Sequence, residues 1–272
     1  MTTDVVTRTA VQQATDRMTI LGVQVEALSM AQLNAIIADA IDHDRHIIIA
    51  NHNLHSIYLF HHDPKMRLFY ASADRIHIDG MGVIGLGRLL GMPLSRDHRV
   101  TFVDWMGPLA KAAAENSWRI FYLGGRPGVS ERGAAVLQDS YPGLQIETAH
   151  GFFDPDPVSA EAQAVIAKID AWRPHLLITG MGMPRQEHWI VDHVGKLSAN
   201  VILNGGAALD YFAGAISTPP RWAGRCGLEW FFRLIAEPRR LWSRYLVEPW
   251  FITYKLLLEI ASKRLSAQRS YE

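Results

Sequence analysis

The chain has 272 residues, of which 49% are hydrophobic, and its formal net charge is zero. This composition indicates a globular protein with apolar material for one well-buried domain and a small appendage, and the charge balance argues against a general nucleic-acid binder. A single cysteine, Cys226, excludes an intramolecular disulfide, so a reducing, cytosolic setting is expected.

The two ends of the chain differ from its middle. Residues 1–17 are polar and mixed in charge, without the apolar core of a secretory signal, and we expect a flexible tail there. Residues 218–272 hold ten Lys and Arg against five Asp and Glu, which makes this segment basic. A helix that spans a membrane needs roughly 18 apolar residues, and charged residues keep every apolar run of this segment shorter than that. We therefore expect peripheral association with the inner face of the cell membrane.

Helical and strand patterns alternate between these ends. Helical periodicity covers residues 30–41, 129–139, 160–171 and 188–197, with Ser29, Ser130 and Ser159 placed as caps or first-turn residues. Short apolar runs cover residues 46–50, 76–78, 119–123, 144–148, 175–179 and 200–203. This alternation predicts an α/β fold, a Rossmann-like parallel sheet with helices on both faces, as a catalytic domain over residues 18–217.

A second unit is expected after this domain. Pro219 and Pro220 break the pattern, and the composition then changes to tryptophan, phenylalanine and arginine. Pro238 and Pro249 divide this segment into short helices, followed by a longer helix over residues 250–265. We therefore predict a C-terminal helical, basic and aromatic appendage over residues 218–272.

Polar residues and glycines follow five of the predicted strands, at the edge where open parallel sheets bind ligands. These segments are Asn51-His-Asn53, Asp79-Gly-Met-Gly82, Gly124-Gly-Arg-Pro-Gly128, Gly180-Met-Gly-Met-Pro-Arg-Gln186-Glu187 and Asn204-Gly-Gly-Ala-Ala-Leu-Asp210. The sequence thus places its candidate chemistry at one edge of the sheet.

Asp79 has two interpretations. Glycines beside a carboxylate at a strand end leave room for a substrate, but spacing alone favours a turn aspartate that caps the next helix. Gly80, Gly82 and Gly85 also form a G-x-G-x-x-G pattern with Asp104 downstream, which keeps a nicotinamide-dependent oxidoreductase as an alternative. Two features count against this alternative: the pattern is short, and the Asp79 carboxylate would lie beside the negatively charged pyrophosphate of the cofactor.

The segment Gly182-Met-Pro-Arg-Gln-Glu187 is equally open. Pro184 suits a first helical position, which would turn Arg185 and Gln186 toward a ligand as an anion-tolerant wall. The alternative is an ordinary strand-to-helix turn in which Glu187 complements the helix dipole. Gly124 and Gly125 carry the same ambiguity.

The histidines do not predict a metal site. His52, His55, His61 and His62 lie close in sequence, but no cysteine and no carboxylate at a diagnostic spacing accompanies them, so packing or surface roles are favoured. No D-x-D pair follows a strand either. We therefore expect no metal and no cofactor.

Arginines and aromatic residues interleave in the first part of the appendage, where six arginines lie between Pro220 and Tyr245: Arg221, Arg225, Arg233, Arg239, Arg240 and Arg244. Such a pattern suits an interfacial module that attracts anionic lipid. Guanidinium groups also bind diphosphate in a bidentate manner, so some of these arginines could cover a donor nucleotide instead. A helix packed on the domain explains the aromatic residues but explains the arginines poorly.

Taken together, these segments resemble the WecG/TagA/CpsF glycosyltransferases (glycosyltransferase family 26) over most of the chain, from about residue 20 to residue 251. The matching motifs are Asn53, Ala73-Asp-Arg-Ile-His-Ile-Asp79-Gly80, Arg99-Val100, Phe121-Tyr-Leu-Gly-Gly125, Tyr141-Pro-Gly143, Gly151-Phe-Phe153, Gly182-Met-Pro-Arg-Gln-Glu187, Gly205-Gly206, Asp210, Ala213-Gly214, Gly227-Leu-Glu-Trp230, Glu237-Pro-Arg239 and Arg244-Tyr245.

The resemblance implies an inverting hexosyltransferase that moves a sugar from a UDP-sugar to a polyprenyl-diphosphate-linked acceptor in bacterial surface or exopolysaccharide biosynthesis. It implies that Asp79 is the general base, that Gln186 and Asn53 position the sugar, and that Arg99 and Asp210 lie near the donor. Without a metal motif, arginine must stabilise the leaving diphosphate, and Arg233, Arg239 and Arg244 are the candidates. Catalysis would then depend on docking of the appendage.

Two departures from the family pattern stand out. Asn51 replaces the usual threonine two places before Asn53, and Thr218-Pro219-Pro220 replaces an Arg-Ala-Pro, which removes one expected contact of the appendage. The donor hexose and the existence of a homo-oligomer stay open. A non-catalytic nucleotide-binding subunit remains a second alternative to the enzyme.

Overall fold

The computed structural model describes residues 17–216, 229–236 and 238–269. Its centre is a six-stranded sheet in which all neighbouring strands are parallel, in the order β4-β3-β8-β7-β5-β6. The strands are β3 (Ile47–His52), β4 (Arg75–Ile78), β5 (Arg119–Gly124), β6 (Gln145–Ala149), β7 (Leu176–Gly180) and β8 (Val201–Asn204). Each corresponds to one of the six predicted strands, which confirms the Rossmann-like fold.

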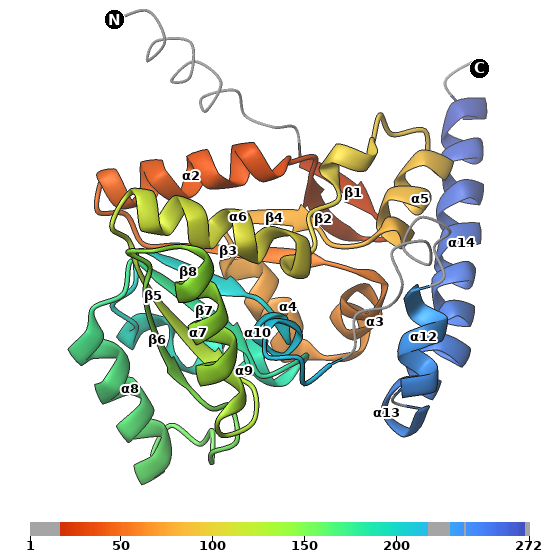
Figure 1. Ribbon diagram of the computed structural model, residues 1–272. Helices are drawn as coiled ribbons and strands as arrows, with labels where there is room; N and C mark the ends of the chain where they lie inside the picture. The colour runs from red at the N-terminus through yellow and green to blue at the C-terminus, as the bar shows by residue number, and fades with distance from the viewer. Residues whose placement is uncertain (1–16, 217–228, 237, 270–272) are drawn as a thin grey trace, which may run out of the picture.

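Helices cover both faces of this sheet (Figure 1). One face carries α2 (Met30–Asp42), α6 (Phe102–Glu115), α7 (Val129–Ser140) and α10 (Ala208–Phe212), and the other carries α4 (Pro64–Ser72), α8 (Ala160–Trp172) and α9 (Arg185–His193). Successive strand residues point to opposite faces, so Ile120 and Tyr122 enter one core while Phe121 and Leu123 enter the other. Both faces are buried, which explains why the strands are continuous apolar runs.

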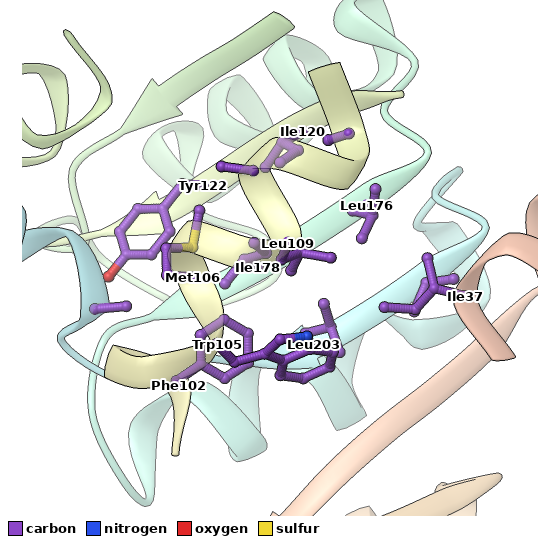
Figure 2. Packing of buried hydrophobic residues seen from close by; sticks show 14 of the residues in the cluster. Ile37, Phe102, Trp105, Met106, Leu109, Ile120, Tyr122, Leu176, Ile178 and Leu203 are labelled. Carbon is purple, nitrogen blue, oxygen red and sulfur yellow. The ribbon is translucent and has the colours of Figure 1, made fainter. Parts of the chain in front are cut away.

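The larger core lies between α6 and the sheet. Figure 2 shows Trp105, Met106 and Leu109 of α6 packed over strand residues that include Ile178 and Leu203. Trp105 is fully buried, and its indole nitrogen donates to Asn34 Oδ1 at 2.8 Å. This pairing satisfies the indole N–H, the polar group that makes burial of a tryptophan costly.

A third apolar cluster closes the end of the domain beside β4. It is built by a hairpin of β1 (Arg17–Ile20) and β2 (Val23–Glu26) with α3 (Leu54–His62) and α5 (Met81–Leu89). Among the C-terminal helices, α14 (Glu248–Arg269) runs along α3 and α5 at the side of the domain in Figure 1 and inserts Ile252 into this cluster. The appendage thus completes a core rather than only touching the surface.

Several sequence predictions need correction. The helix expected over residues 188–197 is α9, which begins at Arg185 and ends at His193 before a 3-10 turn, Val194–Lys196. The long C-terminal helix begins at Glu248 rather than at Trp250. Arg17, assigned to the tail, is the first residue of β1, and residues 1–16 lie outside the described residues.

Other elements were missed because their local signals conflict. The hairpin, α3, α4, α5, α6 and α10 were not predicted, and neither was the 3-10 turn Arg96–His98. Helix α6 contains Pro108 and Gly107, which weaken a local helix signal, yet it is held by buried contacts along one whole face. The short helices of the appendage, α12 (Glu229–Ala236) and α13 (Pro238–Leu246), agree with the predicted division at Pro238.

Candidate active site

Five neighbouring strands bring the predicted site residues to one edge of the sheet. Because all strands are parallel, the residues that follow β4, β3, β8, β7 and β5 lie at the same carboxyl edge. In the order of these strands, the edge carries Asp79, Asn51 with Asn53, Asn204, the Gly182–Glu187 segment, and Gly124 with Gly125. The sheet order alone therefore joins segments that are far apart in the sequence.

Asp79 is held at the start of this row. Its backbone N–H donates to His52 O at 2.9 Å, which continues the pairing of β4 with β3. Asn53 Nδ2 donates to Asp79 Oδ2 at 3.3 Å. Asn53 also caps α3, since its Oδ1 accepts from Ser56 N at 3.0 Å. One asparagine thus fixes the start of a helix and contacts the candidate base.

Arg99 lies beside the same strand end. Val100 N donates to Ile78 O at 2.9 Å, so the backbone of Arg99 runs next to the residue that precedes Asp79. The Arg99 guanidinium donates to Asp104 Oδ2 at 2.8 Å. The predicted position of Arg99 near the site is therefore compatible with the fold, and its role toward a donor stays a prediction.

The geometry does not fit a dinucleotide fingerprint. In that motif the distant acidic residue ends a strand and binds a ribose, whereas Asp104 lies in the first turn of α6 and binds Arg99 and Thr101. Gly82 packs against the Leu54 side chain, and a Cβ there would lie 2.6 Å from Leu54 Cδ1. The nicotinamide alternative has no support in these contacts.

A buried hydrogen-bond network lies in the middle of the row. Asn51 Nδ2 donates to Asn204 O at 2.9 Å and to its Oδ1 at 3.1 Å. Glu187 Oε1 accepts from Asn204 Nδ2 at 3.0 Å and from Gln186 Nε2 at 2.8 Å. Burial raises the pKa of the Glu187 carboxyl, although these two donors oppose the shift. The network links β3, β8 and the start of α9.

Gly124, Gly125 and Asp210 form the other end of the row. A Cβ on Gly124 would lie 2.5 Å from the backbone of Gly180, so the close approach of β5 and β7 requires glycine there. Gly125 has φ +69°, and its missing Cβ would lie 3.6 Å from Asp210 Oδ2. The structure therefore brings together Gly125 and Asp210, which were predicted separately as substrate-binding residues.

Arg185 does not lie where the sequence prediction put it. Its guanidinium donates to Phe153 O and lies over the Phe153 ring, 5.7 Å from the ring centroid. Together with Lys65, His188 and Asp192 it lines an open hollow that includes neither Asp79 nor Asn53. Pro184 is the residue before the helix rather than its first residue. With this helix start, the Gln186 side chain is buried and the Arg185 side chain points away from the strand ends, toward Phe153. We therefore place the candidate site at the strand ends and not at this hollow.

The histidines have packing roles, as predicted. His52 is fully buried and stacks on Tyr70 with 3.8 Å between ring centroids, and burial lowers the pKa of His52 to about 3. His61 Nε2 lies 2.7 Å from Leu21 O, and His62 contacts the Phe251 ring. Within the described ranges no three His, Cys, Asp or Glu side chains form a metal-binding group. That no metal or cofactor is needed stays a prediction.

The appendage is docked next to Asn53 and Asp79. Arg244 of α13 donates to Asn53 Oδ1 at 3.5 Å. His55 Nδ1 lies 2.9 Å from both carboxylate oxygens of Glu248, the first residue of α14. At the far side, Leu21 N donates to Glu259 Oε2 at 2.8 Å. Two helices of the appendage thus fix α3, the helix that Asn53 caps.

The three candidate diphosphate ligands differ in their surroundings. Arg244 reaches the Asn53 amide, whereas Arg239 lies exposed on α13. Arg233 lies in α12, and its side chain is outside what the structure describes, as are Arg221 and Arg225 altogether. Only Arg244 is therefore connected to Asp79 by contacts in the described part of the chain.

Helices α13 and α14 also carry an exposed apolar face. Its residues are Trp242, Leu246, Val247, Trp250, Tyr254, Leu257 and Leu258, and Trp250 is 77% exposed. In α14 these positions follow an i, i+4, i+7, i+8 spacing, which places them on one side, while Ile252 faces the core. Among the described helices, none is both long and apolar enough to cross a bilayer.

A Rossmann-like sheet carries a carboxylate, amides and an arginine at its carboxyl edge, and comparison with known proteins gives the class of the protein. The profile of the "Glycosyl transferase WecG/TagA/CpsF family" matches residues 18–266. The chain belongs to this family of glycosyltransferases.

Relatives of known activity support this assignment. The N-acetylglucosaminyldiphosphoundecaprenol N-acetyl-beta-D-mannosaminyltransferase of Staphylococcus aureus strain MRSA252 is 29% identical over 231 residues, which cover 84% of this chain and 87% of the relative. The protein of the same description from strain NCTC 8325 / PS 47 shows the same identity and coverage.

Sequence reasoning missed three contributors to this site. Glu187 was interpreted only as a helix-dipole residue, Asn204 only as part of a polar loop, and the His55–Glu248 pair not at all. The one available signal was position, because Asn204 ends a strand and Glu187 follows another by a short turn. Their pairing depends on strand order, which that signal does not contain.

Proposed function

We propose that this protein transfers a hexose from a UDP-sugar to a polyprenyl-diphosphate-linked sugar, with inversion at the anomeric carbon. The observation that carries the proposal is the placement of Asp79 at the carboxyl edge of the sheet, bonded to Asn53 and, through Asn53, to Arg244 of the appendage. Membership of the family supports glycosyl transfer. The names of the Staphylococcus aureus relatives support the lipid-linked acceptor.

The proposed reaction is a single displacement. The acceptor hydroxyl attacks the anomeric carbon from the side opposite the diphosphate, Asp79 takes the hydroxyl proton, and the bond from that carbon to the diphosphate oxygen breaks. UDP leaves with the electron pair of that bond. One base on the attacking side and cations on the leaving side are what such a step requires.

The arrangement along the sheet edge suits these roles. Asn53 lies beside Asp79, and the buried Gln186 belongs to the network of Asn51; these two amides are the candidates to position the sugar. Gly125 lies near the start of α7, where a helix N-terminus favours anionic groups, and Asp210 lies beside Gly125. Arg244, with Arg233 and Arg239 on the same appendage, would neutralise the diphosphate. No step in this scheme depends on a metal or an organic cofactor.

The exposed face of α13 and α14 supports a peripheral position on the membrane. An acceptor anchored by a polyprenyl chain lies at the bilayer surface, so the enzyme must work there. Exposed tryptophan and leucine side chains next to arginine and lysine suit insertion at headgroup depth on an anionic leaflet. We propose that this face rests on the inner surface of the cell membrane and presents the site to the lipid-linked sugar, in the synthesis of a surface polysaccharide or exopolysaccharide.

The test is UDP release by the full-length protein from a panel of UDP-N-acetylmannosamine, UDP-glucose and UDP-galactose, with and without a polyprenyl-diphosphate-linked monosaccharide. We expect release that depends on the acceptor. Asp79→Asn should lower it by about 100-fold or more, the contribution of a general base. Asp97→Asn is the matched control, because Asp97 is exposed in the nearby 3-10 turn.

The outcomes separate the alternatives. Acceptor-dependent release that Asp79→Asn abolishes supports the enzyme and its base. Full activity of Asp79→Asn would refute the base, and binding of UDP without release from any donor would favour a nucleotide-binding subunit. Analysis of the product anomer by NMR decides between inversion and retention.

A further inference from the structure

The buried network in the middle of the sheet edge has a carboxylic acid at its centre. Glu187 is 0% exposed, and its Oε1 accepts hydrogen bonds from Gln186 Nε2 and Asn204 Nδ2 at 2.8 Å and 3.0 Å. Asn204 in turn accepts from Asn51 Nδ2. Tyr70, on the helix-covered face below, donates to Asn51 O at 2.8 Å. The acid thus lies in a network of polar groups from β3, β8, α9 and α4 and has no access to solvent.

This network fixes the orientation of the Gln186 side chain. Gln186 Oε1 accepts from the backbone N–H of Gly182 at 3.1 Å, while its Nε2 donates to Glu187. An amide could otherwise rotate by half a turn and exchange its oxygen and nitrogen at little cost. The acceptor at Glu187 and the donor at Gly182 allow only one of the two orientations.

Two further atoms bear on the charge of Glu187. In the described part of the chain, Glu187 Oε2 and Asn51 Oδ1 are buried oxygens of this network that lack a hydrogen-bond partner. Both oxygens can only accept hydrogen bonds while Glu187 is ionised, so this part of the network lacks a donor. A proton on the Glu187 carboxyl would supply a donor. Burial also raises the pKa of Glu187, in the same direction.

We propose that Glu187 is a positioning residue that holds the buried Gln186 amide in one orientation, at the sheet edge where the donor sugar would bind. The orientation of Gln186 is a property of the fold, and its effect on transfer rests on the proposed function. Glu187 itself would not touch the substrate. Its role is to fix which side of the Gln186 amide is the donor and which is the acceptor, and thereby the position of the Gly182 backbone at the strand ends.

Three variants test the proposal in the full-length protein. Glu187→Met keeps much of the side-chain volume and removes the acceptor, whereas Glu187→Gln keeps a neutral acceptor of the same shape. Gln186→Leu removes the acceptor of the Gly182 N–H directly and calibrates the measurement. His193→Ala is the matched control, since His193 is a buried polar residue of the same helix that pairs with Trp189 O instead.

The first readout needs no activity. It is the hydrogen exchange of the Gly182 amide, measured by NMR. We expect the Gly182 amide of Glu187→Met to exchange roughly fivefold faster than that of the wild type, which corresponds to the loss of one hydrogen bond. The exchange rate in Glu187→Met should be close to the rate in Gln186→Leu. Glu187→Gln and His193→Ala should exchange like the wild type. Unchanged exchange in Glu187→Met would overturn the proposal whatever the protein catalyses.

The second readout separates positioning from folding. In the transfer assay, Glu187→Met should raise KM for the donor and also lower kcat, so that kcat/KM falls by ~100-fold. Glu187→Gln should have values of KM and kcat close to those of the wild type. If Glu187→Gln were as impaired as Glu187→Met, the acid would act as a carboxylate and the neutral form would be refuted. If the wild type itself transferred no sugar, the proposed function would fail, and the Gly182 exchange would still decide the orientation of Gln186.

Discussion

Arg244 and Asn53 meet across the boundary between the appendage and the catalytic domain. The guanidinium of Arg244 donates to Asn53 Oδ1 at 3.5 Å, and the nitrogen of the same amide donates to Asp79 at 3.3 Å. Asn53 therefore transmits the position of the appendage to the candidate base. If Arg244 serves the reaction as proposed, the active site requires α13 to be docked.

Replacement of Arg244 should slow transfer without unfolding the domain. We expect Arg244→Ala to lower kcat by about 10- to 100-fold, because a guanidinium that stabilises a leaving diphosphate is lost together with the contact to Asn53. Arg244→Lys should recover only part of the rate, since an ammonium cannot make the bidentate contact. Lys263→Ala, which removes a charge from α14 next to Glu259, is the control. Equal rates for Arg244→Ala and the wild type would disprove the coupling.

Two substitutions of Asn53 separate its cap from its contact with Asp79. Asn53→Ala should lower the free energy of unfolding by about 1 kcal/mol, since the N-cap of α3 is lost. Asn53→Asp keeps the cap but places a second carboxylate beside Asp79. We expect it to keep the contribution of the cap but to be less stable than the wild type at neutral pH, and we expect its activity to need a higher pH, because neighbouring carboxylates disfavour each other's ionisation. Urea unfolding and a pH–rate profile measure the two effects, and an unshifted profile for Asn53→Asp would show that the side chains do not interact.

The exposed face of α13 and α14 should bind anionic vesicles. Deleting residues 218–272 would also remove Ile252 from the third apolar cluster, so point substitutions give a clearer result than truncation. We expect the double variant Trp242→Ser, Trp250→Ser to bind vesicles of anionic phospholipid at least about tenfold more weakly, because two interfacial rings are lost. Leu68→Ser removes an apolar residue that is 60% exposed on α4 and serves as control. Sedimentation with vesicles measures the partition, and equal partition of both variants would exclude this face.

Acid should destabilise the protein through two buried histidines. Burial lowers the pKa of His77 from 6.5 to about 4 and that of His52 from 6.5 to about 3. The unfolded chain therefore binds more protons than the native state below pH 6.5, so the free energy of unfolding falls as the pH decreases from 6.5 toward 4, by up to about 1.4 kcal/mol per pH unit for each histidine.

His77→Phe should remove one of these two contributions. His77 is buried and contacts the edge of Trp105, so a phenylalanine ring fits this site without a group that must stay uncharged. We expect a curve of unfolding free energy against pH that is flatter between pH 6.5 and 4 than that of the wild type. Urea titrations at several pH values measure this slope. A slope that His77→Phe does not alter would show that His77 is charged in the native state.

The sequence by itself determined the architecture of the domain and the kind of residue at its functional edge. Apolar runs of strand length between helical segments leave little choice but a parallel sheet covered on both faces, and a residue that follows such a run must lie at its carboxyl edge. Asp79, Asn51, Asn53, Gly124 and Asp210 could be located in this way. The basic and aromatic character of the C-terminal segment was equally evident.

Only the tertiary structure decided which of these residues meet. Asn51 and Asn204 are 153 residues apart, and Asn53 and Arg244 are 191 residues apart. Their contacts depend on the strand order β4-β3-β8-β7-β5-β6 and on the docking of α14 against α3. Neither is encoded in a local pattern, because strand order and helix docking follow from the packing of the whole core. The buried environment of Glu187 and the turn of Arg185 away from the strand ends arise in the same way.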